Sequence, residues 1–311
     1  MNVGTACYFF AAFFWGLNIP VTTQLFDSFD PYFLADVRAL IAALVLCVVS
    51  VATSGFKTLT VPISITRLAL ISLALAAFFS LYNLGLKYTH PITAVAIMAA
   101  TPVYAAITLR LTTGGALQPG FWVAALLSIL GTAIAILGRP DASVSTLSLQ
   151  GGEILIVLSY VSWNVFSILA QRWFAVEVPQ LQRTYLAMAG AVVWMTLVWA
   201  TVWRMGLIGA PNLAPSQRDL IFVLITAVFS TGLGVAAWNL GVKRIGLAAG
   251  AVWQNTVPVF GVLIAIAFGI MPTAAQLLGG AIVLTGVFYM HWARGHGVQR
   301  QAANKAVNDS I

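Results

Sequence analysis

The stretch Tyr82–Lys87, with the sequence YNLGLK, returns as Trp238–Lys243, WNLGVK, displaced by 156 positions. Both copies follow the order aromatic, Asn, Leu, Gly, apolar, Lys. A Pro-Val pair comes nineteen residues after each Asn, at Pro102 and Pro258. Because two landmarks share one offset, they indicate an internal repeat.

Weaker matches at a slightly shorter offset extend the repeat over more of the chain. Trp15 pairs with Trp163 and Pro31 pairs with Pro179, in both cases 148 positions later. The repeat therefore predicts three units: a first half at residues 1–145, a second half at residues 146–295 and a tail at residues 296–311, expected to be disordered.

Both halves have the composition of a membrane protein. Of the 311 residues, 60% are hydrophobic and only 7% are charged, whereas about a quarter of the residues of a soluble domain are charged. The apolar runs are continuous, as in spanning helices of about 20 residues, and do not alternate as in a membrane β-barrel. We expect an all-α integral membrane protein with ten transmembrane helices, at residues 3–25, 32–52, 66–86, 91–111, 120–138, 152–172, 183–205, 218–240, 247–269 and 275–293.

Five helices per half is an odd number, so the second half is expected to enter the membrane upside down relative to the first. Such inverted repeats are typical of secondary transporters, which alternate access to a site near the middle of the membrane. The loops predict the orientation. If the N-terminus is cytoplasmic, ten lysines and arginines lie on the cytoplasmic side and four on the other. By the positive-inside rule, both termini are expected to be cytoplasmic.

The two Asn-Leu-Gly motifs are expected at opposite faces of the membrane. Asn83 is expected to end the third helix outside, and Asn239 is expected to end the eighth helix inside. One interpretation is that the motifs form two gates; another is that asparagine caps a helix end and glycine allows the turn into the next helix. The two interpretations are compatible with each other. Pro102 and Pro258 are expected to add kinks to their helices. The residues assigned to gates and hinges are Asn83, Gly85, Pro102, Asn239, Gly241 and Pro258.

Polar and aromatic side chains recur at helical spacing near the middle of several predicted helices. Tyr160 and Asn164 share a face of the sixth helix, with Trp163 beside them, and Trp15 and Asn18 share a face of its repeat mate, the first helix. Amides at this depth usually face a bundle interior or a wet cavity, and aromatic rings suit apolar or aromatic groups or cations. The expected substrate-binding residues are Trp15, Asn18, Tyr82, Met98, Thr101, Tyr160, Trp163, Asn164, Gln254 and Asn255.

Charged residues are missing from the middle third of every predicted helix. Asp36 and Arg38 are expected one or two turns below the outer surface, where each anchors at the interface or pairs with another helix. A pocket without a carboxylate argues against a proton-coupled exporter of lipophilic cations. A charge-free pocket of amides, hydroxyls and rings favours a zwitterion instead.

The stretch Asp30–Leu44, DPYFLADVRALIAAL, resembles the start of the second helix in EamA-type members of the drug/metabolite transporter superfamily. The paired motifs and the five-plus-five layout resemble the same family over almost the whole chain, to Arg294. Within the superfamily, the chain is most similar to bacterial amino-acid exporters, in particular to the aromatic amino-acid group. The resemblance implies efflux of amino acids, and of related toxic compounds, across an inner (plasma) membrane.

Other classes of function fit the sequence less well. An intramembrane enzyme would need a converging catalytic or metal-binding set, but His90, His291 and His296 are expected at helix ends, so we expect no enzyme, no metal and no cofactor. Scattered positive charges do not favour nucleic-acid binding. A multidrug or metabolite exporter of the same superfamily, a channel-like facilitator and a receptor stay open. The expected partners are a small-molecule substrate, an amino acid, and the lipid bilayer, with one chain sufficient for the pathway.

Overall fold

The computed structural model describes residues 3–114, 117, 119–138, 151–254 and 256–308, and within these ranges it contains helices and no strand. The helices are α1 (Val3–Leu25), α2 (Pro31–Ser54), η1 (Phe56–Leu59), α3 (Ile65–Lys87), α4 (Pro91–Ala99), α5 (Thr101–Thr113), α6 (Phe121–Leu137), α7 (Gly152–Trp173), α8 (Gln180–Arg204), α9 (Gln217–Ile225), η2 (Thr226–Leu233), α10 (Gly234–Gln254), α11 (Val257–Ala267) and α12 (Ala274–Asn308). The expected all-α class is confirmed.

Local sequence signals explain where several helices begin and end. The carboxylate of Asp30 accepts hydrogen bonds from the backbone N–H groups of Tyr32 and Phe33, at 3.0 and 2.9 Å, with proline in the first turn of α2. Such a capped start satisfies backbone donors that the helix itself leaves free. α5 ends before Gly114, whose φ of +69° is the left-handed conformation that favours glycine.

Within the described residues, seven helices are long and apolar enough to cross a membrane, or eight if the bent pair of α4 and α5 forms one span. Full-length helices are not found for the predicted spans at 120–138 and 247–269. The first of these is α6, with 17 residues, and the second is divided between the end of α10 and the 11-residue α11. The number of ten spanning helices is therefore not confirmed.

Two helices break at equivalent positions of the repeat. α4 and α5 meet at Ala100 with a bend of 51°, and α11 follows α10 after Thr256, 156 positions later. In each case, the helix after the break carries proline as its second residue, at Pro102 and Pro258. Proline has no backbone N–H and clashes with the preceding turn, so a break immediately before it follows directly from the sequence.

The prediction that the Asn-Leu-Gly motifs end their helices is confirmed for the first motif and wrong for the second. Asn83 and Gly85 lie close to the end of α3 at Lys87, whereas Asn239 lies within α10, which continues to Gln254. In both motifs the glycine allows close packing. A Cβ at Gly85 would lie 2.7 Å from Cγ1 of Ile156 in α7, and one at Gly241 would lie 2.8 Å from the ring of Tyr8 in α1.

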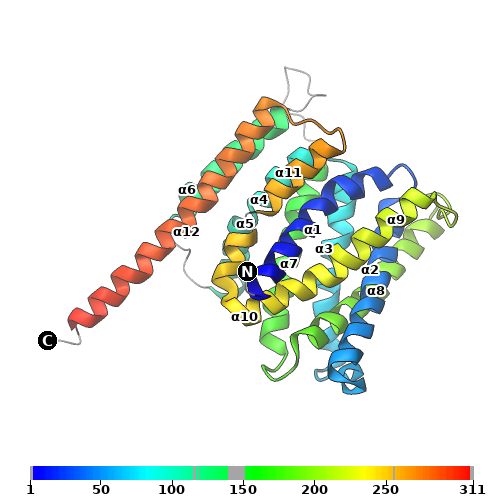
Figure 1. The fold of residues 1–311 in the computed structure, drawn as a ribbon, viewed down its shortest axis with the longest axis horizontal. Helices are drawn as coiled ribbons and strands as arrows, with labels where there is room; N and C mark the ends of the chain where they lie inside the picture. The colour runs from blue at the N-terminus through cyan, green and yellow to red at the C-terminus, as the bar shows by residue number, and fades with distance from the viewer. Residues whose placement is uncertain (1–2, 115–116, 118, 139–150, 255, 309–311) are drawn as a thin grey trace.

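The helices form a bundle with one pair beside it. α3 packs along α7, α1 packs along α10 and α11, and α2 packs along α8. α6 and α12 run side by side at the edge of this bundle (Figure 1). Their contact depends on small residues, because a Cβ at Gly286 would lie 2.8 Å from Cβ of Leu127, and small residues let membrane helices approach closely. Residues 296–308 of the tail expected to be disordered are helical, since α12 continues to Asn308.

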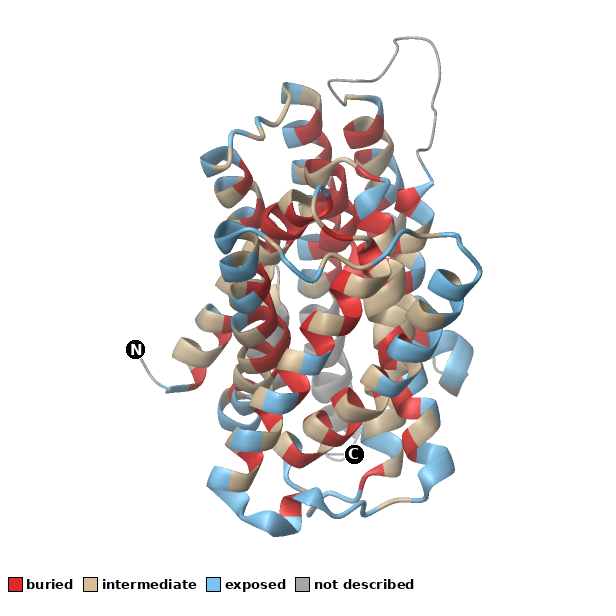
Figure 2. Ribbon diagram, turned by 90° about the vertical axis from the view of Figure 1, so that its right-hand side faces the viewer, coloured by how far each residue is buried: buried red, intermediate tan, exposed pale blue. Residues whose placement is uncertain are grey.

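Large apolar side chains cover the outside of the bundle as well as its interior. Val48, Ile129 and Val193 are each at least 60% exposed, and Figure 2 shows the buried residues gathered toward the middle of the bundle. Apolar surface of this extent is stable in a lipid environment and not in water. Together with the spanning helices, it makes the chain a multi-pass membrane protein.

Candidate functional site

A cavity lies inside the bundle, where helices from both halves of the chain meet. It encloses about 80 Å³, compared with the roughly 10–15 Å³ that one water molecule needs. α1, α2, α3, α4, α7, η2 and α10 contribute to its wall. The lining residues are Trp15, Asn18, Arg38, Phe78, Phe79, Tyr82, Asn83, Met98, Tyr160, Trp163, Ser230, Thr231, Val235 and Gln254.

Aromatic rings form one wall of the cavity. Trp15 and Trp163 meet edge to face, with ring centroids 6.5 Å apart and an interplanar angle of 80°. Phe78 packs 5.0 Å from Trp163, and Tyr82 lies 6.4 Å from Tyr160. Edge-to-face contacts between rings are favourable, so the rings hold one another in place. The wall offers an apolar surface with phenol and indole groups at its margin.

A π-helix, η2, supplies the part of the wall that faces Trp15. Nε1 of Trp15 donates a hydrogen bond of 3.1 Å to the carbonyl of Ser230, and the Ser230 hydroxyl donates to the carbonyl of Phe14 at 2.5 Å. Thr231, the next residue, donates to the carbonyl of Thr226 at 3.1 Å. Single π-helical segments often occur at functional sites, and this one places Ser230 and Thr231 on the cavity wall.

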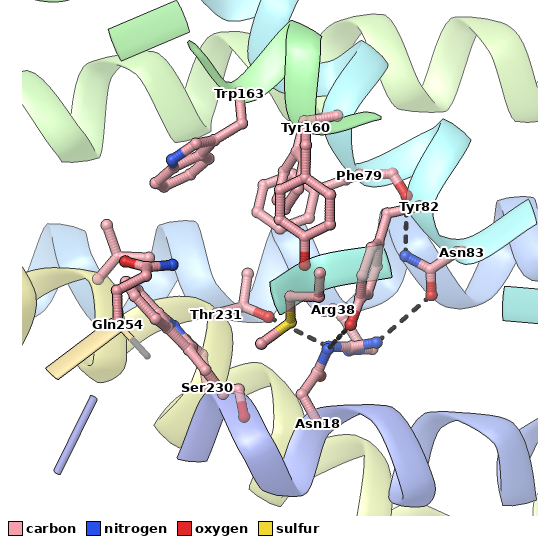
Figure 3. A pocket seen from close by; sticks show the side chains of 14 residues that line it. Asn18, Arg38, Phe79, Tyr82, Asn83, Tyr160, Trp163, Ser230, Thr231 and Gln254 are labelled. Carbon is pink, nitrogen blue, oxygen red and sulfur yellow. Dashed lines mark hydrogen bonds between the residues drawn. The ribbon is translucent and has the colours of Figure 1, made fainter. Parts of the chain in front are cut away.

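The polar end of the cavity is built around Arg38. Its Nη1 donates to Oγ1 of Thr22 at 2.9 Å and to Oδ1 of Asn83 at 3.4 Å. Its Nη2 donates to Oδ1 of Asn18 and, at 3.4 Å, to Oγ1 of Thr231. Figure 3 shows the guanidinium between Asn18 and Asn83, with Tyr160 and Trp163 across the cavity. The interpretation of a charge-free pocket is therefore wrong, because α2 turns this arginine inward.

Asp36, two residues before Arg38, faces a different helix. Both of its carboxylate oxygens accept from the hydroxyl of Thr196 in α8, at 3.0 Å. Positions two apart on a helix point in different directions, so the two charges do not meet. Asp36 pairs with another helix, which was one of the two arrangements expected for it.

Seven of the ten expected substrate-binding residues line the cavity, and one expected gate residue, Asn83, lines it too. The seven are Trp15, Asn18, Tyr82, Met98, Tyr160, Trp163 and Gln254. Thr101 and Asn164 are not among the lining residues; their side chains bond to the carbonyls of Met98 and Tyr160, one turn earlier. Asn255 lies outside the described residues.

The remaining gate and hinge residues lie outside the cavity lining. Asn239 donates to Oγ1 of Thr184 at 2.8 Å, and Gly85 and Gly241 pack against neighbouring helices. Pro102 and Pro258 lie at the helix breaks. Their predicted functional roles stay predictions.

Six of the lining residues were not predicted from the sequence: Arg38, Phe78, Phe79, Ser230, Thr231 and Val235. A signal existed for Arg38, because an arginine within an apolar span is by default a candidate for function. Phe79 and Val235 are 156 positions apart, so the repeat could have paired them once either was known. Ser230 and Thr231 had no comparable signal, since their direction depends on the π-helix.

Packed membrane-spanning helices around an aromatic cavity with one buried cation define an integral membrane protein with an internal ligand-sized site. Comparison with known families identifies which kind. The model of the EamA-like transporter family matches residues 2–137 and 150–292, and the chain belongs to this family. The resemblance to EamA-type transporters is thus confirmed.

Two individual comparisons agree with this assignment. The uncharacterized transporter YyaM of Bacillus subtilis (strain 168) is 26% identical over 275 residues, which cover 88% of both chains. A solved crystal structure superimposes with a TM-score of 0.67 at 20% sequence identity, over 94% of this chain and 97% of the other. The latter similarity is one of fold.

Proposed function

We propose that this chain exports amino acids with aromatic or other apolar, neutral side chains across an inner (plasma) membrane. In this proposal, it is a secondary transporter that alternates access to the central cavity by rocking two five-helix halves, residues 1–145 and 146–295. The observation that carries the proposal is the cavity itself. Its wall combines aromatic rings, which suit an apolar side chain, with amides that can bind the polar groups of a zwitterion.

The origin of the lining residues supports a site shared between two halves. Three pairs of repeat-related residues line the cavity together: Trp15 with Trp163, Phe79 with Val235, and Met98 with Gln254. Transporters built from inverted repeats bind their substrates at the interface between the repeats. A cavity at this interface is reached from either side when the halves move relative to one another.

Equivalent packing contacts support the inverted repeat. Gly85 packs on Ile156, and Gly241, 156 positions after it, packs on Tyr8. Ile156 in turn follows Tyr8 by 148 positions. The two contacts therefore join corresponding surfaces in the two halves, and the equivalent helix breaks before Pro102 and Pro258 supply matched positions for hinges.

The proposed orientation depends on the loops. With both termini cytoplasmic, the lysines and arginines favour the cytoplasmic side by ten to four, as the positive-inside rule requires. Cysteine labelling of single exposed positions, such as Lys57→Cys and Leu213→Cys, would test it. Labelling of Leu213→Cys from the outside and of Lys57→Cys only after permeabilisation is expected, and the reverse pattern would contradict the orientation.

The transport proposal is tested with the purified protein in proteoliposomes and a panel of amino acids, with and without a proton gradient. We expect saturable flux and counterflow for phenylalanine, tryptophan and leucine, and weaker flux for charged amino acids. Saturable flux without any amino-acid transport, for other organic compounds, would favour a multidrug or metabolite exporter. Conductance that does not saturate would favour a channel-like facilitator.

A further inference from the structure

Arg38 is a buried cation whose hydrogen-bond partners are all neutral. Only 4% of its surface is exposed. Its four acceptors are hydroxyl and amide oxygens, from Thr22, Thr231, Asn18 and Asn83. The nearest acidic residue in its own helix, Asp36, is bonded to Thr196. Burying a charge without an opposite charge is costly, so the arrangement needs a reason beyond packing.

The guanidinium still has a donor to offer. Nε of Arg38 is buried and has no hydrogen-bond partner, while Nη1 and Nη2 are held by the neutral oxygens. The side chain itself lines the cavity (Figure 3). An arginine held in this way is preorganised, because its plane is fixed before a ligand arrives. A guanidinium suits a carboxylate oxygen, because a hydrogen bond between two charged groups is stronger than one between neutral groups, and the Nε–H group of Arg38 is the donor left for it.

The opposite wall shows what the rest of the ligand must be. Trp163, Phe78 and Tyr160 present rings across the cavity from Arg38. No Asp or Glu occurs among the described residues that line the cavity, so an ammonium group would find dipoles and rings but no opposite charge. The charges of the site therefore select for a negative group at one end and an apolar body at the other.

We propose that Arg38 binds the carboxylate of the transported molecule, and that the cavity recognises aromatic carboxylates by this group and not by their amine. This inference deepens the proposed function and rests on its premise that substrate binds in the central cavity. It predicts that an aromatic acid without an amino group is a ligand. It also predicts that an aromatic amine without a carboxylate is not.

The first test uses the unmodified protein and three probes of similar size: 3-phenylpropionate, its neutral amide 3-phenylpropanamide, and phenethylamine. Binding to the purified protein in detergent is measured by calorimetry. We expect the carboxylate to bind at least about ten-fold more tightly than the amide, as for a charge-assisted hydrogen bond, and phenethylamine to bind more weakly still. Equal affinities, a preference for the amine, or no binding of 3-phenylpropionate would each overturn the proposal.

The second test assigns the preference to Arg38. In Arg38→Gln, the ratio of carboxylate to amide affinity is expected to fall to about one. Arg38→Lys keeps the charge but loses the Nε–H donor, so its ratio is expected to fall between those of the unmodified protein and Arg38→Gln. Arg218→Gln is the matched control, because Arg218 is exposed, bonds to Gln24 at 3.2 Å and does not line the cavity. A purely structural role for Arg38 would lower both affinities together and leave the ratio unchanged, and this result would overturn the proposal.

The first test does not depend on any variant, since the probe comparison uses the unmodified protein, and in the second test Arg38→Lys provides a variant that keeps the charge if Arg38→Gln fails to fold. They also separate this inference from the proposed function. If carboxylate preference depends on Arg38 but no amino acid is transported, the transport proposal fails and the binding site stands. If phenylalanine flux is saturable and Arg38→Gln retains both the flux and the affinity ratio, the transport proposal stands and the inference about Arg38 fails.

Discussion

Asn83 and Asn239 occupy the same position of the repeat but have different neighbours. Asn83 is 2% exposed, lines the cavity and accepts from Arg38. Asn239 is only half-buried and donates to the hydroxyl of Thr184, outside the cavity lining. At the position of α8 that corresponds to Arg38, 148 residues later, the chain carries the buried Leu186.

The difference teaches that backbone symmetry and chemical symmetry are separate properties. One pair of packing contacts is matched between the repeat copies, Gly85 on Ile156 and Gly241 on Tyr8. The buried cation and its ring of neutral acceptors come almost entirely from α1, α2 and α3, with Thr231 of η2 as the one contribution from the second half. A matched scaffold can move about a central axis while one half carries the polar recognition.

The largest effect on function is expected from the paired tryptophans. Trp163→Ala should lower amino-acid flux about ten-fold or more, since removing a ring forfeits about 2 kcal/mol of apolar contact with the substrate. Trp15→Ala should lower both flux and melting temperature, because it also removes the hydrogen bond to Ser230. Flux and thermal unfolding are measured on the same preparations. Unchanged flux of every amino acid in Trp163→Ala would remove this residue from the site.

The matched glycines allow a comparison of stability. Gly85→Ala should cost about 1–3 kcal/mol, as overpacking does, because its Cβ would lie 2.9 Å from the backbone oxygen of Gly152. Gly241→Ala should cost less, since the nearest atoms to its Cβ all belong to the side chain of Tyr8 and none to the backbone. Melting temperatures in detergent give the order. A larger loss for Gly241→Ala would show that the α1–α10 contact is the more rigid of the two.

The two asparagines provide the next comparison. Asn83→Ala removes an acceptor from a buried cation and should cost about 1–2 kcal/mol of stability, whereas Asn239→Ala should cost at most about 1 kcal/mol. Asn83→Ala should also reduce the preference for 3-phenylpropionate over its amide, because Arg38 is held less firmly. Asn239→Ala serves as the control. Equal effects on that preference would mean that the polar cluster does not belong to one half.

The smallest effect is expected from conservative changes of the tryptophans. Trp15→Phe loses the donor to the Ser230 carbonyl and should cost about 0.5–1.5 kcal/mol. Trp163→Phe keeps its ring contacts with Phe78 and Phe166 and should be closer to neutral. Thermal unfolding separates them. A greater loss in Trp163→Phe would contradict the assignment of a polar anchoring role to Trp15 alone.

Much of the fold could be predicted from the sequence because its causes are local. Continuous apolar runs predicted the helices, and Pro102 and Pro258 mark helix breaks that proline chemistry explains. Gly241 was the exception, because α10 continues through it. Glycine serves both turns and close packing, and only the neighbouring helix, with Ile156 or Tyr8 on its surface, decides between them.

The site was less predictable, because it depends on the direction of side chains across helices distant in sequence. Depth and spacing were enough to select Trp15, Trp163 and Met98 as residues that line the cavity. Arg38 was placed near the outer surface by counting turns along α2. Such a count gives the depth of a residue in the membrane but not the neighbouring helix that its side chain faces. Asn164 shows the converse: it lies at a suitable depth, yet its amide is bonded within α7, to the carbonyl of Tyr160.

The π-helix at Thr226–Leu233 carries a wider turn than the α-helical segments around it. The equivalent stretch of the first half, residues 70–77, lies within the regular helix α3. One residue corresponds to about 100° of rotation in an α-helix, so deleting a single residue here would turn one side of the helix by that angle relative to the other. A one-codon deletion, rather than a set of substitutions, is then enough to change which residues of this helix line the cavity.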